Sequence, residues 1–481
     1  MTAITGIGAY APWFRISADA FEAAWGRFDA AGVNEKAVPS ADEDALTMAY
    51  EAAMRAISAA DIDSEAIEYL AFASSRPPLA EEDLTARLGA MLEVPEPATR
   101  DVFVGSTRAG TRALRAGSDA LETGTGAEST LGLVVAADAP EGATDGSIDH
   151  AAGAGAAAFV LEPEGPARLR DRAEYAAPYP GTRFRVTGED ETRGLGVTQY
   201  DRQAFTESIG GAVDGLESDP DVDAAAIQAP DGKLPYRAAG AAGVSTDEIR
   251  AAATVHELGD LGAASVPVSL ASALADGHES VLAVSQGGGV SADAIVVEST
   301  GAVPAETALE GDEPLSYAEY LRQRGVVTSG PPSGGGAYVS VPTWRRSIPQ
   351  RYNLEAGRCP DCGAVSFPPE GACTDCGVLG EYERLRLPGT GTVEAVTTIS
   401  QGGAPPEFAE QQSRSGDYAA AIVALETGNG DGSVSIAAMG TDAAPGAFGV
   451  GDRIETTIRR IYTQEGVTRY GFKIRPEGSR S

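Results

Sequence analysis

Short apolar runs alternate with Ala-rich amphipathic stretches through the first three hundred residues of the chain. The apolar runs predict strands at residues 3–10, 67–75, 131–139, 155–163, 222–230 and 279–288. Stretches whose apolar positions recur at helical spacing predict helices at residues 44–59, 109–121 and 235–242. Because strands and helices alternate along the chain, this part is typical of an α/β domain.

The remainder of the chain follows a different pattern. One more helix is predicted at residues 315–324, and the Pro, Gly and Ser content of residues 328–338 predicts a flexible linker. Beyond the linker we expect no further helix. Five β-rich runs follow, at residues 391–400, 418–426, 432–440, 452–462 and 469–476. Five short strands with long loops favour a small barrel of the OB type.

The chain is strongly acidic. Its 481 residues include 70 Asp and Glu against 36 Lys and Arg, a formal charge of -34 that disfavours direct binding to nucleic acid or to an anionic membrane. This composition is typical of a halophilic protein that stays soluble in concentrated salt, and an ordinary acidic cytosolic protein is the alternative. No apolar stretch approaches ~20 residues and the start lacks the order of a signal peptide, so we expect a cytoplasmic protein.

All four cysteines lie in two short motifs, CPDCG and CTDCG, as Cys359, Cys362, Cys373 and Cys376. Two such knuckles place four thiolates around one tetrahedral ion, and the Gly after each second Cys permits a tight turn that directs main-chain amides at the sulfurs. A redox dithiol or a pair of disulfides would need an oxidising compartment or a thioredoxin-like context, and neither is visible. The motifs therefore predict zinc, and four cysteine ligands leave no open position for catalysis.

The region around these cysteines resembles a known family. The sequence WRRSIPQRYNLEAGRCPDCG, followed by a β-rich segment that closes on YGFKIRP, is similar to the zinc-ribbon and OB-fold family that accompanies acyl-CoA-condensing enzymes. The resemblance implies a rubredoxin-like zinc ribbon at residues 339–380 and an OB-fold domain at residues 381–481. It also implies a bridging role beside a thiolase or synthase, with no catalytic residue in this module.

The first part of the chain resembles a second family. Segments such as VFVGSTRAGTRAL, APDGKLPYRAAGAAG, GDLGAASVPVSLASAL and SQGGGVSADA follow in the order of 3-hydroxy-3-methylglutaryl-CoA synthase-like members of the thiolase superfamily. The resemblance implies a duplicated α-β-α-β-α layered fold, with halves at residues 1–165 and 166–327, two mixed five-stranded sheets and an active site between the halves. It implies a coenzyme A thioester as ligand, and a homodimer or a mixed complex with a thiolase or synthase subunit.

The catalytic positions of that family carry other residue types here. The family uses a Cys nucleophile, a His and a Glu, together with an Asn in a Gly-Asn pair. The corresponding positions in this chain are Thr107, preceded by Ser106, then Gln228, Ser74 and Asp260. Since residues 1–358 contain no Cys, the usual thiolate mechanism is excluded.

Two interpretations therefore remain open. In the first, the chain binds acyl-CoA without Claisen chemistry and assembles with a competent partner. In the second, it is an acyltransferase whose nucleophile is Thr107 or Ser106, with Asp260 or His256 as the base that a hydroxyl needs.

Residues for ligand binding follow from the same resemblance. Lys233 occupies the family's KLP position, with Arg237 one helical turn on, and coenzyme A phosphates require local positive charge in so acidic a chain. An ordinary surface lysine is the alternative for Lys233. Gly287 and Gly288 repeat the family's Gly-rich turn, where small residues let the main chain approach a ligand. His256 lies at the edge of the expected site, where it could contact bound ligand.

Overall fold

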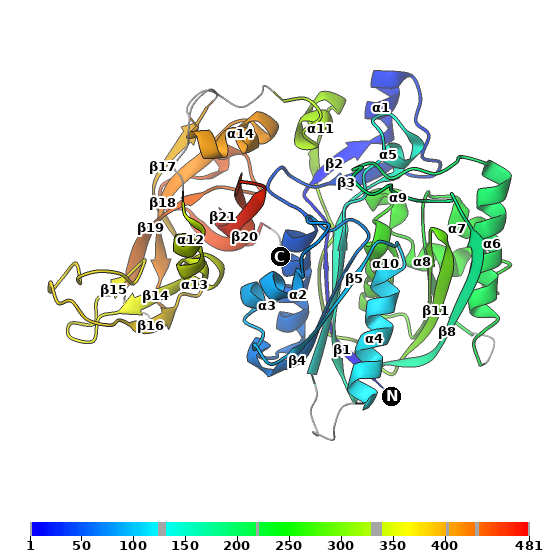
Figure 1. Cartoon of the computed structure of the whole chain (residues 1–481), viewed down its shortest axis with the longest axis horizontal. Helices are drawn as coiled ribbons and strands as arrows, with labels where there is room; N and C mark the ends of the chain where they lie inside the picture. Colours follow the sequence, from blue (N-terminus) through cyan, green and yellow to red (C-terminus); the bar gives the residue numbers. More distant parts are fainter. Residues whose placement is uncertain are drawn as a thin grey trace. The chain divides into compact units, whose positions relative to one another are not determined.

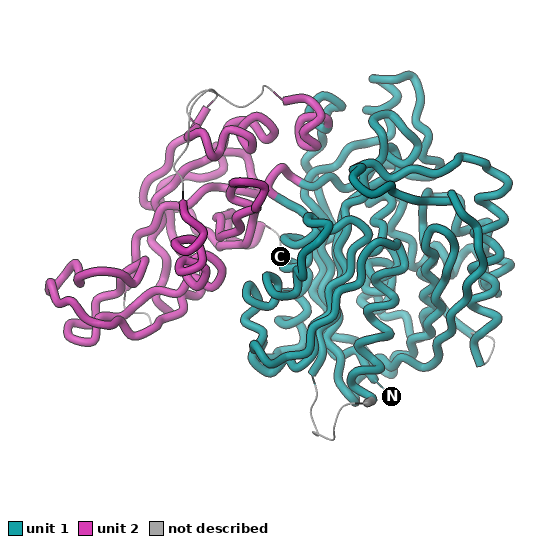
Figure 2. Tube along the Cα trace, viewed as in Figure 1, with its two compact units in different colours: residues 1–39, 43–320 teal, residues 40–42, 321–481 magenta. Residues whose placement is uncertain are grey.

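A computed structural model describes residues 2–123, 131–217, 221–328, 339–400, 404–428 and 432–479. The chain divides into two compact units, one made of Met1–Pro39 and Glu43–Tyr320 and the other of Ser40–Asp42 and Leu321–Ser481 (Figure 2). The predicted linker lies outside the described residues, except for its first residue. None of the described helices is long and apolar enough to cross a membrane.

One ten-stranded sheet runs through the first unit (Figure 1). Its order is β5-β4-β6-β7-β1-β8-β11-β10-β9, and β12 (Ala305–Ala308) pairs with β1 off this path. The strands are β1 (Ala3–Tyr10), β4 (Ile67–Ser74), β5 (Thr99–Val104), β6 (Leu131–Asp138), β7 (Gly155–Glu162), β8 (Ala167–Tyr179), β9 (Ala224–Ile227), β10 (Ser280–Gly287) and β11 (Gly289–Ser299). A separate small sheet contains β2 (Phe14–Ser17), β3 (Glu35–Val38) and β13 (Glu313–Pro314). All six strands predicted for this unit are present.

The sheet is internally duplicated. In the first half, β4 pairs parallel with β6, and β7 pairs antiparallel with both β6 and β1. The second half repeats this pattern, because β9 pairs parallel with β10, and β11 pairs antiparallel with both β10 and β8. The second half has no counterpart of β5 among the described strands. Only two residue pairs join β1 to β8. The expectation of two five-stranded sheets is therefore corrected to a five-stranded and a four-stranded half joined edge to edge.

The helices form layers on and between these halves. Helix α2 (Ala45–Ala60) is capped by Asp44, whose carboxylate accepts hydrogen bonds from two main-chain amides of the first turn. The helix packs closely against β1, since a Cβ on Gly8 would lie 2.0 Å from the carbonyl of Ala52. Helices α4 (Ala109–Thr123) and α10 (Ser265–Ala275) pack between the halves, and α6 (Thr198–Val213) covers β8 and β11. The predicted α-β-α-β-α arrangement is confirmed.

Shorter helices complete the first unit. They are α1 (Ala18–Trp25), α3 (Thr85–Leu92), α5 (Ser147–Ala151), α7 (Leu234–Arg237), α8 (Thr246–Ala252) and α9 (Val255–Leu258). The helix predicted at residues 235–242 is wrong in length, because it ends at Arg237 and continues as turns. Gly240 and Gly243 follow within six residues, and glycine disfavours the helical conformation.

The second unit ends in a small barrel. Its strands β17 (Thr390–Ile399), β18 (Tyr418–Glu426), β19 (Ser433–Met439), β20 (Arg453–Gln464) and β21 (Val467–Pro476) pair antiparallel in the order β19-β18-β17-β20-β21. A bridge between Gly440 and Ile474 nearly closes the ring. The five predicted runs and the barrel are confirmed.

A zinc ribbon and short helices precede and accompany the barrel. The ribbon strands are β14 (Glu355–Arg358), β15 (Val365–Ser366) and β16 (Glu383–Arg386). The predicted helix at residues 315–324 is α11 (Tyr317–Gln323). The expectation of no helix beyond the linker is wrong, because α12 (Val341–Arg346), α13 (Ile348–Asn353) and α14 (Ala409–Ser415) follow it. Each has seven residues or fewer, which is too short for a helical period to show in the sequence.

Candidate functional site

The two cysteine motifs fold into matching knuckles. In the first, the amide of Gly363 donates to the carbonyl of Cys359 over 2.9 Å, and in the second the amide of Gly377 donates to that of Cys373 over 2.9 Å. Gly363 and Gly377 have φ values of 78° and 74°, a conformation that only glycine adopts without strain. The tight turn predicted after each second cysteine is therefore present.

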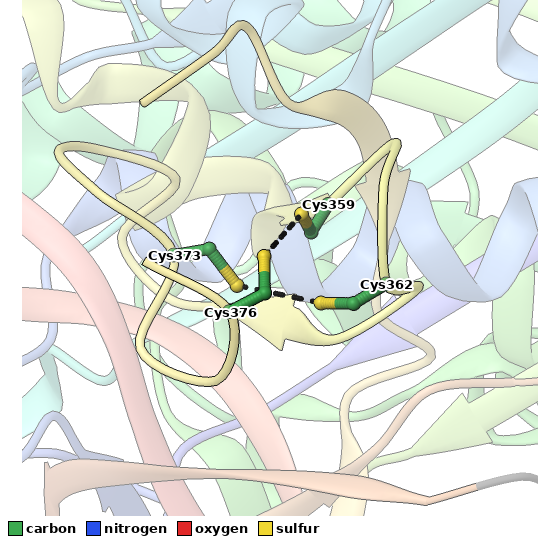
Figure 3. A group of neighbouring side chains, drawn as sticks. All are labelled: Cys359, Cys362, Cys373 and Cys376. Carbon is green, nitrogen blue, oxygen red and sulfur yellow. Dashed lines mark hydrogen bonds between the residues drawn. The ribbon is translucent and has the colours of Figure 1, made fainter. Parts of the chain in front are cut away.

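The four sulfurs converge on one point (Figure 3). All four Sγ atoms lie within 4.8 Å of one another, with 3.7 Å between Cys359 and Cys376 and 3.6 Å between Cys362 and Cys373. A tetrahedral zinc ion with bonds of ~2.3 Å separates its sulfur ligands by about 3.8 Å. The donor set fits zinc and offers no fifth ligand position, which confirms the predicted structural cluster.

Main-chain amides point at the sulfurs, as predicted. Hydrogen bonds from the amides of Cys376 and Asp375 lower the pKa of the Cys373 thiol to about 7. The amides of Ala364 and Val378 also bond Cys362 and Cys376, but burial and the neighbouring thiols outweigh these bonds and raise the pKa of both thiols. These bonds favour the thiolate form that binds a metal.

In the first unit, the residues that the resemblance assigns to the family's catalytic positions lie at strand ends or in turns that precede helices. Ser74 ends β4, Thr107 lies in the turn from β5 to α4, and Gln228 directly follows β9. Asp260 lies in the turn before α10, and Gly287 ends β10. Carboxyl ends of strands in α/β sheets are where ligands bind, because loops and helix N-termini gather there.

Thr107 and Ser106 form the turn that starts α4. Gly105 adopts a φ of 79° there, which allows the chain to leave β5 sharply. The hydroxyl of buried Thr107 donates to the carbonyl of Gln286 over 2.5 Å. The hydroxyl oxygen of Ser106 accepts the amide of Arg108 at 3.3 Å.

Ser74, Gln228 and Asp260 meet around the turn at residues 260–263, which sequence reasoning alone did not place together. Gln228 Nε2 donates to the carbonyl of Gly262 over 3.0 Å, and the amide of Gly262 donates to Asp260 Oδ1 over 2.9 Å. The residue that links this turn to Ser74 is Asp138, at the end of β6. Its carboxylate accepts the Ser74 hydroxyl at 3.2 Å and the amide of Ala263 at 2.7 Å.

Asp138 was missed by the sequence analysis. It is fully buried and also accepts the amides of Ser75, Arg76 and Ala139, so its carboxylate fixes the ends of two strands and one turn. The available signal was an acidic residue that ends the apolar run of residues 131–139.

Arg183 was also missed. Its Nη1 lies 2.6 Å from Asp260 Oδ2, so one of the two residues considered as a base is held in an ion pair. Arg183 Nη2 and Gln228 Oε1 are buried and have no hydrogen-bond partner among the described residues. Because an unsatisfied buried polar atom costs about 1–3 kcal/mol, both atoms are suited to bond a polar ligand or water.

The two glycines of the predicted ligand-binding turn leave room for neighbouring groups. A Cβ on Gly287 would lie 2.3 Å from the hydroxyl of Ser106, and one on Gly288 would lie 2.1 Å from the carbonyl of Arg183. A larger residue at Gly287 would displace the Ser106 side chain, and one at Gly288 would displace the main chain at Arg183.

The predicted cationic residues lie on and beside α7. Lys233 precedes this helix and Arg237 ends it, both are exposed, and neither forms an ion pair among the described residues. His256 Nδ1 faces the carbonyl of Gly32 at 2.6 Å and therefore carries the proton, while Nε2 accepts the hydroxyl of Tyr236 at 2.8 Å. Both ring nitrogens of His256 are thus occupied.

Comparison with known proteins separates the two parts of the chain. A hydroxymethylglutaryl-CoA synthase of Archaeoglobus fulgidus is 29% identical over 353 residues, which cover 67% of this chain and 98% of that synthase. A DUF35 domain-containing scaffold protein of Methanothermobacter thermautotrophicus is 34% identical over 140 residues, which cover 29% of this chain and 96% of the scaffold protein. Residues 346–381 match the family described as ChsH2, rubredoxin-like zinc ribbon domain.

Solved structures share the fold of the larger part. A synthase described as HMG-CoA synthase complexed with CoA superposes with a TM-score of 0.60 at 17% identity, covering 70% of this chain and 94% of that chain. MvaS in complex with 3-hydroxy-3-methylglutaryl coenzyme A gives a TM-score of 0.58 at 19% identity, covering 71% of this chain and 97% of that chain. At these identities the likeness establishes a common fold.

Proposed function

The chain joins a hydroxymethylglutaryl-CoA synthase-like thiolase fold to a C-terminal region that belongs to the DUF35 family, and we propose that it binds acyl-CoA for a catalytic partner. The partner is a thiolase or synthase subunit, and the chain itself performs no Claisen condensation. Both resemblances noted in the sequence are confirmed by the comparisons.

The observation that carries the proposal is the state of the nucleophile position. The hydroxyl proton of Thr107 is donated to a main-chain carbonyl, and no side-chain base contacts this hydroxyl among the described residues. Asp260 is paired with Arg183, and both nitrogens of His256 have other partners. A hydroxyl becomes a nucleophile only when a base removes its proton, so this arrangement favours binding without chemistry.

Several groups support acyl-CoA binding in the first unit. The amides at the start of α4 and the unpartnered Nη2 of Arg183 are suited to a thioester carbonyl. The unpaired cations Lys233 and Arg237 are suited to phosphate groups. The relatives that are complexed with CoA and with 3-hydroxy-3-methylglutaryl coenzyme A share this fold.

Two features support assembly with another subunit. The DUF35 relative is a scaffold protein. In the first unit, β5 ends the sheet and has no neighbour on its outer side among the described strands, and Val104 of this strand is 44% exposed. An open strand edge pairs readily with a second sheet, which supports a homodimer or a mixed complex.

One observation favours the alternative, an acyltransferase with an oxygen nucleophile. The hydroxyl proton of Ser106, unlike that of Thr107, is not donated to any described residue. Ser106 is therefore the residue through which this alternative would operate.

The test is incubation of the full chain with acetyl-CoA or acetoacetyl-CoA, followed by intact-mass spectrometry and an assay for free coenzyme A. We expect measurable binding, no acyl group on the protein and no coenzyme A release above background hydrolysis. An acyl group that appears on the wild-type chain and is lost in Ser106→Ala or Thr107→Ala would refute the proposal and establish the transferase.

A further inference from the structure

An apolar pocket of about 630 Å³, open to solvent, lies beside strands β17, β18 and β19 of the barrel. We call it the barrel cavity; its lining includes Val396, Ile399, Phe408, Ile422, Met439 and Phe472. Cavities of about 300–1,000 Å³ accommodate small organic ligands, and an apolar lining with a few polar groups is typical of such sites.

One charged side chain lines this apolar space. Arg351, on α13, borders the barrel cavity, and its Nε donates to the hydroxyl of Ser347 over 2.9 Å. Its guanidinium lies 4.1 Å from the centre of the Trp344 ring. Burial lowers the pKa of Arg351, and no carboxylate of the described residues forms an ion pair with it.

A second arginine approaches the same ring. Arg469, on β21, is 4% exposed, and its guanidinium lies 5.2 Å from the centre of Trp344. Its Nε is buried without a hydrogen-bond partner, and no described acidic residue pairs with it. Tyr462 packs edge-on against Trp344 at 6.0 Å and against Phe408 at 6.1 Å, so aromatic rings connect these cations to the barrel cavity.

Arg469 is buried and Arg351 is half-buried, and unpaired cations in such positions are unexpected in a protein with 70 acidic residues against 36 basic ones. Other buried cations of the second unit have acidic partners: Lys473 pairs with Asp42 and Arg459 with Asp442, both at 2.7 Å. A buried charge without a partner is costly, because desolvation is not offset by an opposite charge. Arg351 and Arg469 are therefore arranged for an anion that does not come from the described part of the chain.

We propose that the barrel cavity binds an anionic amphiphile, with its apolar tail among the aliphatic and aromatic side chains and its head on Arg351 and Arg469. The head is a carboxylate or a phosphate, because guanidinium groups bind both through paired hydrogen bonds. This site shares no residue with the acyl-CoA site of the first unit. Loss of either function would therefore leave the other intact.

The test is calorimetric titration of the full chain with decanoate, decyl phosphate and decanol, each below its micelle concentration. We expect at least one of the two anions to bind about tenfold more tightly than the neutral alcohol, since a charged hydrogen bond is lost with the alcohol. A preference between decanoate and decyl phosphate would identify the head group. Equal affinity for the alcohol and both anions, or no binding of any of the three, would overturn the proposal.

Variants separate the head site from the tail site. Arg351→Met should weaken anion binding about tenfold and leave decanol binding unchanged, while Arg351→Lys should retain most of the anion preference. Ala438→Phe places a large side chain in the barrel cavity and should weaken the binding of all three ligands. This variant keeps the proposal testable if Arg351→Met does not fold. The control is Arg384→Met, at an 83% exposed side chain of the ribbon, which should change nothing. Anion binding by Arg351→Met at wild-type strength would contradict the proposed head site.

Discussion

Lys473 Nζ lies 2.7 Å from Asp42 Oδ2, although 431 residues separate the two in the sequence. Both side chains are buried, and the same carboxylate accepts the hydroxyl of Thr441 at 3.0 Å. Asp42 belongs with Ser40 and Ala41 to the second unit, so a short segment from the connection between β3 and α2 is part of the barrel unit.

The three lysines of the chain differ in their exposure to solvent. Lys36 is buried in the first unit, where its Nζ donates to the hydroxyl of Tyr320 over 3.0 Å and to the carbonyl of Asp149. Lys473 is buried in the second unit, which leaves only Lys233 exposed. The one lysine that the family resemblance places at the ligand is thus the one available to bind it.

Asp42→Asn should lower the free energy of unfolding of the second unit by about 3–5 kcal/mol, because it leaves Lys473 buried without an opposite charge. Burial alone would raise the pKa of Asp42, but Lys473 and Arg459 outweigh it and hold this pKa below its ordinary value. A carboxyl with a lowered pKa contributes stability above its unfolded value of about 3.9 and loses it as the pH falls further. Denaturant titrations should show the wild-type advantage at pH 7 and its decline below about pH 4.

The matched control for this pair is Glu370→Gln, at an exposed carboxylate, which should leave stability unchanged. A wild-type advantage that persists unchanged to the lowest pH at which both proteins fold would contradict a lowered pKa of Asp42.

Cys362→Ser should release the metal and unfold the ribbon while the first unit stays folded. Four-thiolate zinc sites contribute on the order of 10 kcal/mol to the folding of small domains, and three thiolates hold the ion less tightly. Elemental analysis of freshly purified, reduced protein should give one zinc per chain for the wild type and for Thr374→Ser, a change between two ligands. Wild-type protein without metal would refute the assignment.

Lys233→Glu should weaken acyl-CoA binding by about threefold to tenfold, and more at low salt, because it replaces an exposed cation by an anion facing phosphate groups. Thr107→Ala should leave the affinity nearly unchanged, because its hydroxyl is already donated to Gln286. Calorimetry with acetyl-CoA measures both, and Lys233→Arg is the charge-conserving control. An unchanged affinity of Lys233→Glu for acetyl-CoA would show that Lys233 does not contact the bound ligand.

The melting temperature should fall as salt is removed. The Debye length grows from about 3 Å at 1 M to about 10 Å at 0.1 M, so 70 carboxylates with few cationic partners repel one another over longer distances. Calorimetric scans in sodium or potassium chloride measure this dependence. Equal melting temperatures at low and molar salt would refute the halophilic interpretation.

Thr107→Cys should accept an acetyl group from acetyl-CoA and then stop before carbon-carbon bond formation. A cysteine thiolate is a good nucleophile, but the resemblance assigns Gln228 and Ser74 to the positions of the family's His and Glu, and neither residue can act as the required acid or base. Intact-mass spectrometry detects the acyl group, and wild-type protein is the control. Formation of 3-hydroxy-3-methylglutaryl-CoA by this variant would show that other residues supply the acid and base.

The sequence alone determined those features that are encoded within a short window of residues. Apolar runs identified six strands of the first unit and all five barrel strands, because a buried strand needs a local block of apolar side chains. The spacing of Cys359, Cys362, Cys373 and Cys376 was sufficient for the zinc site, because each knuckle brings two ligands together by itself. Short helices such as α12 and α13 were not predicted, because six residues are too few to show a helical repeat of apolar positions.

Only the tertiary structure decided which polar groups meet. Asp138 joins the ends of β4 and β6 to the turn at residues 260–263, and Arg183 reaches Asp260 from 77 residues away. Lys473 finds Asp42 across nearly the whole chain, and Arg351 and Arg469 meet at Trp344. Such contacts depend on how elements distant in the sequence pack against one another. The repeat of apolar residues and the spacing of motifs describe single elements and do not specify that packing.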